Sequence, residues 1–550
     1  MTSISASAEQ FAQWRADGWH QYRGLGEVCA QSFSEFPEAV VRWDSALRPA
    51  SASFADIGAE VGRASAGLAS LGVSAGDVVA IQLPNWRENL VLLHACFRLG
   101  LIVLPIIHSY GPAELNFILG QSQAEVLVMP DRWRHINYIE RVTQLEAASR
   151  PERLIVIGED VPDGAASWTE LLSGNDSISE PVPVDPSDVC ALVYTSGTTG
   201  RPKGVQHSHN TLLTRAIAGF AGAPAGRHVE FTMLPSGHIT GVMRGLRIVT
   251  SGSDAIYMDE WDAGRALALI EQHRVTVFGA TPFFLTEMLA HPDFAGRDLS
   301  SVQSVMVGGA NVPSDLIRVA DAGGWPAMRS YGMTEHPTAF VSRFDDNLAA
   351  RATTDGRIEC GAEVRLVDDE GRNVPEGEWG EIVLSGPAQF VGYREPSDNE
   401  GAFLEPGWFR TGDLGTLNDR GYLTVVGRKK DVIIRGGENI SSAEVEEVLQ
   451  SCSGIREAAA IGYPDARYGE RVCAVIVMES DVDPISVEGL KAEFKEKGVA
   501  TFKLPERIAF VDELPRSTNG KVLKAKLRDD LFGENDPHPA QANPRTQAKF

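Results

Sequence analysis

The 550-residue sequence predicts an α/β protein, with a large N-terminal domain of doubly wound sheets followed by a small α+β C-terminal domain. Three observations lead to this prediction. The length exceeds the roughly 100–200 residues of one ordinary domain, so several structural units are expected. Short β-branched runs alternate with helical patterns through most of the first 340 residues. Other patterns replace this alternation near residues 357 and 430.

The alternation is clearest in four strand-like runs separated by helical segments. A helical pattern such as AGRALALIEQH (263–273) puts its apolar residues on one face, which suits a helix lying against a sheet. Strands that alternate with helices are typical of parallel sheets covered by helices. The runs are DVVAIQL (77–83), AEVLVMP (124–130), RLIVIG (153–158) and VTVFGA (275–280).

One apolar stretch, residues 90–107, could be mistaken for a membrane span. His94 and Arg98 interrupt it and Gly100 divides it, whereas a spanning helix needs about 20 nearly uninterrupted apolar residues. A helix ending near Gly100, followed by the strand LIVLPII, fits better. No transmembrane segment is therefore expected.

The pattern changes at residue 357 and again at residue 430. RIECGAEVRLVDDEGR and WGEIVLSG are short strands broken by Gly and Asp turns, which indicates a small antiparallel or β-barrel-like unit that completes a large domain of residues 1–429. A hinge is expected near Lys430. The C-terminal domain, 430–532, opens with a capping box from Ser441 to Glu444 and continues with EAAAIGYP, ERVCAVIVM and the helix VEGLKAEFKEKG. Residues 533–550 are polar and aperiodic, which predicts a disordered tail.

Composition excludes several classes of protein. The net charge of −24 argues against a nucleic-acid binder, because phosphate affinity depends on basic surface. The six cysteines are dispersed and never approach CxxC spacing, so they are expected to be reduced and mostly buried. The first residues lack the basic and apolar regions of a secretory signal, and together these features favour the cytoplasm.

The segment Ser196–Gly204, SGTTGRPKG, directly follows the buried run VCALVY. Glycines let a backbone approach phosphate oxygens, Ser and Thr donate hydrogen bonds, and Lys203 adds positive charge. The common nucleotide loop GxxxxGK[ST] does not match here. Taken alone, the segment is either a phosphate-holding turn or a flexible Gly/Thr loop.

A series of further motifs follows in order: LPSGHITG (234–241), VGGANVP (307–313), YGMTE (331–335), WFRTGD (408–413), GRKKDVIIRGGENI (427–440) and PRSTNGK (515–521). With YTSGTTGRPKG (194–204), this series resembles the adenylate-forming superfamily of acyl-CoA synthetases, firefly-type luciferases and the adenylation domains of peptide synthetases. The resemblance runs from about residue 30 to residue 530. Singly, each residue also has a structural reading: Asp413 as a turn residue, Glu335 and His238 as capping or buried polar groups, Lys521 as a solvated lysine.

The resemblance implies a binding site for ATP and AMP. Tyr331 would stack on the base, Thr334 would lie near the α-phosphate, and Asp413 would accept both ribose hydroxyls. Glu335 resembles the magnesium ligand of the family, and Mg²⁺ prefers such hard oxygen ligands. The implied site comprises Thr195, Ser196, Gly197, Thr198, Thr199, Gly200, Lys203, Gly309, Ala310, Asn311, Tyr331, Gly332, Met333, Thr334, Asp413, Arg428 and Lys521.

The resemblance also implies a reaction in two steps. Lys521 would bridge the attacking carboxylate and the α-phosphate, with Thr334, Glu335 and His238 as the other catalytic residues. Pyrophosphate leaves, and a thiolate then attacks the acyl-AMP, giving an acid–thiol ligase whose cofactors are ATP, Mg²⁺ and coenzyme A. The mobile small domain would rotate about the hinge at Lys430 between the steps, bringing Gly436 and Gly437 to the CoA arm. A plain turn role for these two glycines also fits.

The acyl pocket departs from the usual pattern, because Pro-Ser-Gly precedes His238 and His336 follows Glu335. Its mainly apolar lining with small residues predicts a medium-chain, alicyclic or aryl acid. The expected lining is His238, Gly241, Val242, Met243, Gly279, Thr281, Gly308, Gly332 and His336.

Other functions remain open at this point. A free-standing adenylation enzyme could load a carrier protein, and a catalytically silent nucleotide-binding protein would use the same fold. The segment ITGVMRG lacks the aspartate that would hold an amino-acid substrate, so amino acids are disfavoured. The expected partners are a small carboxylic acid, ATP and CoA, without nucleic acid, and a homodimer is left open.

Overall fold

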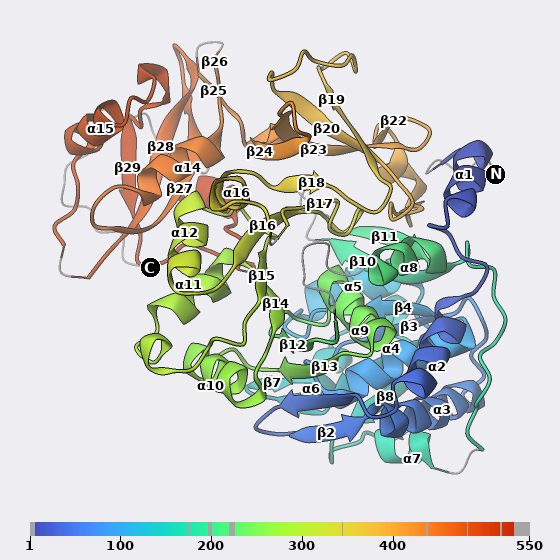
Figure 1. The fold of residues 1–550 in the computed structure, drawn as a ribbon. Coiled ribbons are helices and arrows are strands. Elements are labelled where there is room, and N and C mark those ends of the chain that lie inside the picture. Colours follow the sequence, from blue (N-terminus) through green and yellow to red (C-terminus); the bar gives the residue numbers. More distant parts are fainter. Residues whose placement is uncertain are drawn as a thin grey trace. The chain divides into compact units, whose positions relative to one another are not determined.

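The structure is a computed structural model drawn in Figure 1. The chain divides into two compact units, Met1–Val425 and Val426–Phe550. The structure describes residues 6–173, 176–195, 201–218, 226–343, 345–435, 438–480, 482–517 and 520–532.

The first unit contains an eight-stranded sheet that is parallel through most of its width (Figure 1). Its strands are rich in Val, Ile and Leu and are buried on both faces, as expected of a parallel sheet. The pair β10–β11 is antiparallel and lies toward one edge. In order across the sheet the strands are β21 (Gly392–Tyr393), β11 (Lys203–Ser208), β10 (Val189–Thr195), β4 (Ile102–Pro105), β3 (Val78–Ile81), β5 (Val126–Pro130), β8 (Arg153–Ile157) and β9 (Ala166–Ser167).

A fourteen-stranded sheet, also shown in Figure 1, joins parallel strands to the antiparallel strands expected after residue 357. Parallel pairing extends from β1 through β13, β12, β14 and β15 to β16; β2 pairs antiparallel with β1, and antiparallel pairing begins again at β17. In order the strands are β19 (Glu363–Val367), β20 (Gly380–Ser385), β23 (Trp408–Leu417), β24 (Tyr422–Arg428), β18 (Gly356–Ile358), β17 (Phe340–Val341), β16 (Ala327–Tyr331), β15 (Ser304–Val307), β14 (Val277–Ala280), β12 (Val229–Thr232), β13 (Asp254–Met258), β1 (Val40–Asp44) and β2 (Ala50–Ser53), with β22 (Phe403–Glu405) paired to β23.

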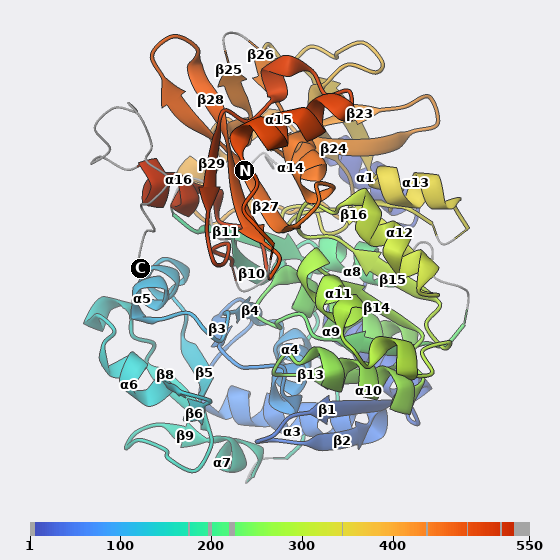
Figure 2. The same ribbon diagram turned by 90° about the vertical axis from the view of Figure 1, so that its left-hand side faces the viewer.

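Helices cover both faces of the parallel strands, which is the doubly wound arrangement predicted from the alternation. One core packs α2, α3, α4, α8 and α9 between the two sheets, and a second packs α10, α11 and α12 on the opposite face of the larger sheet (Figures 1 and 2). The helices are α1 (Ala8–Ala16), α2 (Leu25–Glu35), α3 (Phe54–Ser70), α4 (Arg87–Leu99), α5 (Pro112–Ser122), α6 (Tyr138–Thr143), α7 (Trp168–Leu172), α8 (His209–Ile217), α9 (Ile239–Ser251), α10 (Ala263–His273), α11 (Pro282–Ala290), α12 (Ser314–Ala322) and α13 (Leu348–Thr353).

The apolar stretch 90–107 folds as a helix and a strand, as predicted. Helix α4 ends where Gly100 adopts φ 69°, and strand β4 begins at Ile102. Glycine accepts this left-handed conformation because it has no Cβ, so it stops the helix at little cost. Among the described residues, no helix is both long and apolar enough to cross a membrane.

The second unit is a small α+β domain with its own apolar core. Ser441 caps α14 by accepting a hydrogen bond from the Glu444 N–H at 3.1 Å, as predicted. The return bond of the predicted capping box is not formed; the Glu444 carboxylate pairs instead with Lys503 Nζ at 2.5 Å, because an ammonium competes for it. The elements are β25 (Ile433–Arg435), β26 (Glu438–Ile440), α14 (Ser442–Gln450), β27 (Ile455–Asp465), β28 (Gly469–Met478), α15 (Val487–Glu496), β29 (Arg507–Phe510) and α16 (Lys524–Phe532).

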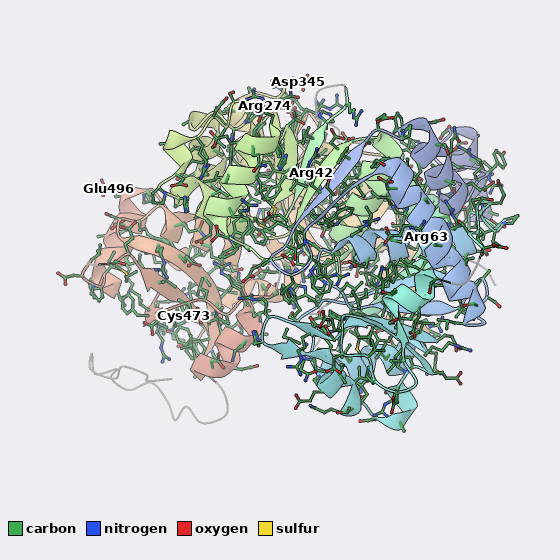
Figure 3. All side chains as sticks on the ribbon, turned by 90° about the horizontal axis from the view of Figure 1, so that it is seen from below. Arg42, Arg63, Arg274, Asp345, Cys473 and Glu496 are labelled. Carbon is green, nitrogen blue, oxygen red and sulfur yellow. The ribbon has the colours of Figure 1, made fainter. Side chains whose placement is uncertain are left out.

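All six cysteines are free and buried, as expected for reduced thiols. Figure 3 shows one of them, Cys473, among the strands of the second unit, whereas Glu496 points outward. Burial raises the pKa of Cys473 to about 12, so the thiol is protonated and unreactive at neutral pH.

Candidate active site

The predicted phosphate loop is flanked by paired strands. β10 ends at Thr195 and β11 begins at Lys203, and the two residues lie opposite each other. The Lys203 ammonium lies 4.8 Å from the centre of the Tyr393 ring and 3.7 Å from Asp398 Oδ1. The rest of the predicted loop, Ser196–Gly200, lies outside the described residues, so its role stays a prediction.

The end of β16 brings two predicted residues together. The Tyr331 hydroxyl donates a hydrogen bond to Asp413 Oδ2 at 2.8 Å, although 82 positions separate the two residues. Asp413 lies on β23 and is buried, and its N–H donates to Thr411 Oγ1 at 3.1 Å. An aromatic ring and a buried carboxylate that are held together by a hydrogen bond suit a base and its ribose.

Glu335 follows four residues later and is held at both its main chain and its side chain. The Phe390 N–H donates to the Glu335 carbonyl at 2.8 Å, and the Tyr393 hydroxyl donates to Glu335 Oε1 at 2.7 Å. Burial and the neighbouring Glu335 carboxylate raise the pKa of Tyr393, so the tyrosine stays protonated and its O–H donates to the carboxylate. Glu335 is therefore a fixed carboxylate, which fits a hard cation.

The described residues contain no cluster of three or more His, Cys, Asp or Glu side chains that could hold a metal ion by themselves. The predicted magnesium site does not require such a cluster, because Mg²⁺ is usually bound by one or two carboxylates together with the phosphates of the nucleotide.

His207 is a residue that the sequence patterns missed. It lies fully buried on β11, its Nε2 lies 2.7 Å from the Thr334 carbonyl, and its Nδ1 lies 3.1 Å from Thr211 Oγ1. Burial lowers the pKa of His207 to about 4, so the ring is neutral at pH 7. A carbonyl only accepts, so we assign the proton to Nε2 and the acceptor role to Nδ1. The sequence feature that could have indicated His207 is its place in a strand directly after the predicted phosphate loop.

Three residues of the implied ATP and AMP site, Gly309, Ala310 and Asn311, follow β15. Gly309 has φ 79° and is exposed, as is Asn311, while Ala310 is half-buried. Gly308 donates its N–H to the Ala280 carbonyl at 3.1 Å, and a Cβ there would lie 2.5 Å from Ser330 Oγ. The missing side chains therefore allow neighbouring strand ends to approach closely.

The predicted acyl-pocket residues come from four segments of the first unit. His238 precedes α9, which carries Gly241, Val242 and Met243. Burial, and then the neighbouring His108, lower the pKa of His238 to about 4, so this histidine is also neutral at pH 7. Gly279 lies near the end of β14. Thr281 precedes α11, and its side chain accepts no hydrogen bond from the N–H groups of the first helical turn.

His336 is fully buried, and neither ring nitrogen has a hydrogen-bond partner among the described residues. Burial, followed by the neighbouring His207 and Arg215, lowers its pKa to about 3. Gly332 packs so closely on the same turn that a Cβ would overlap the Thr338 backbone nitrogen. The turn Thr334–Thr338 is thus held between β16 and His207.

The remaining predicted residues belong to the second unit or its boundary. Arg428 is the last residue of β24, and Lys430 lies in the short helix Lys429–Asp431. Two hydrogen bonds join Lys521 to Ser517. The Lys521 N–H donates to Ser517 Oγ at 3.2 Å, and the Ser517 N–H donates to the Lys521 carbonyl at 2.8 Å. Gly436 and Gly437 lie outside the described residues.

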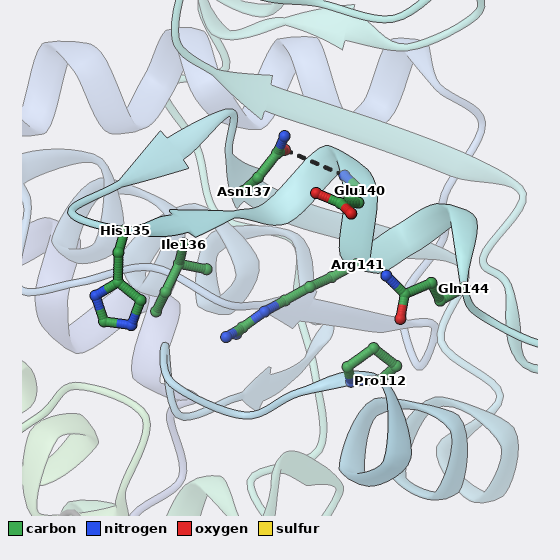
Figure 4. Close-up of a pocket in the computed structure, with 7 residues that line it drawn as sticks. All are labelled: Pro112, His135, Ile136, Asn137, Glu140, Arg141 and Gln144. Atoms are coloured by element: carbon green, nitrogen blue, oxygen red, sulfur yellow. Dashed lines mark hydrogen bonds between the residues drawn. The ribbon is translucent and has the colours of Figure 1, made fainter.

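A separate hollow of about 260 Å³ lies beside α6 (Figure 4). No predicted site residue lines it. The Arg141 guanidinium in this hollow donates to the carbonyls of Tyr110 at 2.7 Å and Ser109 at 3.2 Å, and the Tyr138 hydroxyl donates to the His108 carbonyl at 2.9 Å. The Arg141 and Tyr138 side chains thus hold the turn that carries His108. The lining residues are Pro112, His135, Ile136, Asn137, Glu140, Arg141 and Gln144.

The chain is similar in sequence to known proteins. A family model for the AMP-binding enzyme matches residues 30–394, and a model for the AMP-binding enzyme C-terminal domain matches residues 444–521. The chain is 34% identical over 468 residues to a medium-chain fatty-acid–CoA ligase of Escherichia coli, covering 84% of this chain and 82% of that protein. It is 35% identical over 478 residues to a feruloyl-CoA synthase of Amycolatopsis, covering 86% and 93%.

Solved structures show the same fold. ATP-bound MatB from Rhodopseudomonas palustris aligns with a TM-score of 0.83 at 29% identity, covering 92% of this chain and 99% of that one. The anthranilate CoA ligase AuaEII in complex with anthranoyl-AMP aligns with a TM-score of 0.85 at 25% identity, covering 92% and 97%. The chain therefore belongs to the AMP-binding enzyme family, as the ordered motifs indicated.

Proposed function

We propose that this protein is an AMP-forming ligase that joins a carboxylic acid to coenzyme A in two steps. The observation that carries the proposal is the placement of the Tyr331–Asp413 pair and the Tyr393–Glu335 pair on one turn and its neighbouring strands. The named relatives, which are acid–CoA ligases, support the choice of acceptor.

In the first step, the substrate carboxylate attacks the α-phosphorus of ATP and pyrophosphate leaves. Asp413 would accept the ribose hydroxyls, and Thr334 would donate to the α-phosphate. Mg²⁺ would be held by Glu335 and the nucleotide phosphates, where it would reduce the repulsion between the two reacting anions. Lys521 would supply a second positive charge to the same oxygens.

In the second step, the CoA thiolate attacks the acyl carbon and AMP leaves. The glycines at 436 and 437 would let the backbone approach the pantetheine arm, and the second unit would turn about Lys430 between the steps. We place the enzyme in the cytoplasm, because six buried, unpaired thiols suit a reducing compartment.

The substrate that we propose has an apolar body, such as a medium-chain, alicyclic or aryl acid. The predicted lining is mainly apolar and contains small residues, and relatives named for medium-chain fatty acids and for ferulate have acids of this kind.

The test is acid-dependent ATP–pyrophosphate exchange across a panel of acids, followed by thioester and AMP analysis with CoA. We expect exchange with at least one acid and equal amounts of thioester and AMP once CoA is added. Exchange with no acid would contradict the proposal. Thioester formed on a pantetheinylated carrier protein but not on CoA would assign a different acceptor.

A further inference from the structure

A group of buried charges lies between α9 and the larger sheet. The Glu230 carboxylate on β12 is fully buried, Arg244 Nη1 lies 2.9 Å from its Oε2, and Arg247 pairs with Oε1. Burial opposes ionisation of Glu230, but the two guanidinium groups outweigh it and lower its pKa. Two guanidinium groups thus share one carboxylate.

Two hydroxyl groups beside these charges have no hydrogen-bond partner in the described part of the chain. Thr232 and Tyr257 lie side by side in the parallel pair β12–β13, and both are less than 5% exposed. Thr232 and Glu230 are two residues apart on one strand, so they share a face of the sheet. Tyr257 is the register partner of Thr232, so its side chain lies on the same face of the sheet as Thr232 and Glu230.

A third hydroxyl, that of Thr281, is 4% exposed and also lacks a partner in the described chain. Leaving one buried polar group unpaired costs about 1–3 kcal/mol. Native proteins keep few such groups, so three in adjoining strands call for an explanation. A bound molecule that accepts hydrogen bonds would satisfy all three.

The Arg244 guanidinium lies against Gly279, which is one of the residues of the predicted acyl pocket. A Cβ at this position would overlap Arg244 Nη2, so the glycine is what lets the guanidinium lie against β14. Thr281 follows two residues later, and its Cγ2 would lie 3.7 Å from a Cβ on Gly309. Helix α9 carries Arg244 one turn beyond Gly241. The cluster therefore borders residues expected to contact the acid.

We propose that Arg244, Thr232, Tyr257 and Thr281 form a subsite that recognises an oxygen at the end of the substrate acid remote from the reacting carboxylate. The inference rests on the ligase function proposed above. The shared chemistry is a hydrogen-bond acceptor, which a hydroxyl, a ketone or a second carboxylate can supply. A guanidinium carries five N–H donors in a fixed fork, and each hydroxyl adds one donor. The substrate then has an apolar body and a polar far end.

The test compares matched acids in ATP–pyrophosphate exchange with the full chain. The pairs are benzoate against para-hydroxybenzoate and terephthalate, and heptanoate against pimelate. We expect kcat/KM for an oxygen-bearing member to exceed that of its apolar partner by tenfold or more, because a site built for hydrogen bonds rejects analogues that lack them, in measured cases by about 10⁴-fold or more. Preference for terephthalate and pimelate would identify a carboxylate, and preference for para-hydroxybenzoate a neutral oxygen.

Two isosteric variants, Tyr257→Phe and Thr281→Val, separate recognition from a structural role. Each is expected to lower the ratio of kcat/KM between oxygen-bearing and apolar acids by about tenfold, the value of one hydrogen bond of about 1.4 kcal/mol. Their Tm is expected to stay level or rise, because the deleted hydroxyls have no hydrogen-bond partner among the residues that the structure describes. Tyr138→Phe is the stability control: its hydroxyl bonds the His108 carbonyl, so its Tm should fall.

The outcomes are distinct. Exchange that favours the apolar member of every pair overturns the subsite and leaves the ligase function standing. A lower Tm in both variants with an unchanged acid ratio also overturns it, since the hydroxyls would then serve the fold. Exchange with no acid overturns the proposed function itself.

Discussion

At the residue scale, two residues with proposed roles in the reaction are held by side chains from other segments. Glu335 and Thr334 are both fixed by partners from other segments, Tyr393 on β21 and His207 on β11. Both partners reach the turn through strands of the other sheet. The turn is thus positioned before any ligand binds, which is what preorganised electrostatic stabilisation requires.

Tyr393→Phe removes the hydrogen bond to Glu335 and leaves the ring in place. A bond to a charged group is worth about 1.5–3 kcal/mol, so we expect exchange to fall about tenfold or more. The Mg²⁺ concentration for half-maximal rate should rise with it, because the carboxylate loses its fixed orientation. Mg²⁺ titrations of both proteins check this.

Tyr422→Phe is the matched control for Tyr393→Phe. Its hydroxyl also donates to a carboxylate, that of Asp346 at 2.6 Å, but away from the predicted site residues. We expect its Mg²⁺ dependence to equal that of the unmodified protein. Identical Mg²⁺ curves for all three proteins would remove Tyr393 from the site.

Thr338 is a strained residue beside Glu335. Its φ of 48° is left-handed, which is rare for a β-branched residue. Thr338→Gly should raise the free energy of unfolding by about 1 kcal/mol, measured by urea denaturation, because the strain of about 1–3 kcal/mol exceeds the extra chain entropy of glycine. Exchange should slow, since the turn holding Glu335 becomes looser.

Gln123→Gly gives the comparison for Thr338→Gly. Gln123 has φ 55° at the end of α5, away from the predicted site residues. We expect a smaller gain in stability there and no change in exchange. A loss of stability in Thr338→Gly would mean that contacts of the threonine side chain outweigh its strain.

At the element scale, the regular parts of the fold could be predicted from local patterns. AGRALALIEQH predicted the helix that spans Ala263–His273, and Gly100 marked the end of α4. The partner of the Glu444 carboxylate could not be foreseen, because Lys503 lies 59 residues away. His207 escaped for the same reason, since its partner Thr334 lies 127 positions later.

The motif residues Tyr331, Glu335 and Asp413 were predicted from their order along the chain. The buried charges around Glu230 were not predicted, because the charged face of an amphipathic helix is usually exposed to solvent. Only packing between two sheets turns that face inward. Distant pairing, rather than local propensity, is the part that sequence patterns do not encode.

The end of β16 depends on a glycine. In Gly332→Ala the new Cβ would overlap the backbone nitrogen of Thr338, and backbone cannot move aside as a flexible side chain can. We expect a loss of about 1–3 kcal/mol in the free energy of unfolding, as for overpacked cores, and a large loss of exchange. Urea denaturation and the exchange assay measure the two effects.

Gly296→Ala is the control for Gly332→Ala. No atom lies within 4 Å of a Cβ built there, and its φ is not left-handed. Its stability should change by no more than about 0.5 kcal/mol. Equal effects of the two substitutions would show that close packing at Gly332 is not the cause.

At the scale of the whole molecule, buried histidines make stability depend on pH. Burial is the main cause that lowers the pKa of His108, His207, His209 and His238 to about 4 and that of His94 and His336 to about 3. Unfolded histidines titrate near 6.5. Between pH 6.5 and 4 the unfolded chain binds more protons, so stability must fall as the pH falls.

Urea denaturation from pH 7 to pH 4 checks this sign and gives the proton uptake on unfolding from its slope. At pH 5 the His336→Gln variant should take up about one proton fewer than the unmodified protein. The control is His135→Gln, which replaces an exposed histidine. Stability that is flat across this window would mean that water reaches the buried rings.

Substitution of Lys521 tests whether this residue of the second unit serves only the first of the two proposed steps. If the lysine serves adenylation alone, Lys521→Ala should lower acid-dependent ATP–pyrophosphate exchange by several orders of magnitude, because the charge that bridges carboxylate and α-phosphate is lost. Thioester formation from a supplied acyl-adenylate and CoA should stay within a fewfold of the unmodified rate. Lys526→Ala, which removes a lysine paired with Asp530 on the same unit, should leave both rates unchanged. Equal loss of both steps in Lys521→Ala would contradict the alternation, since one fixed arrangement would then serve both reactions.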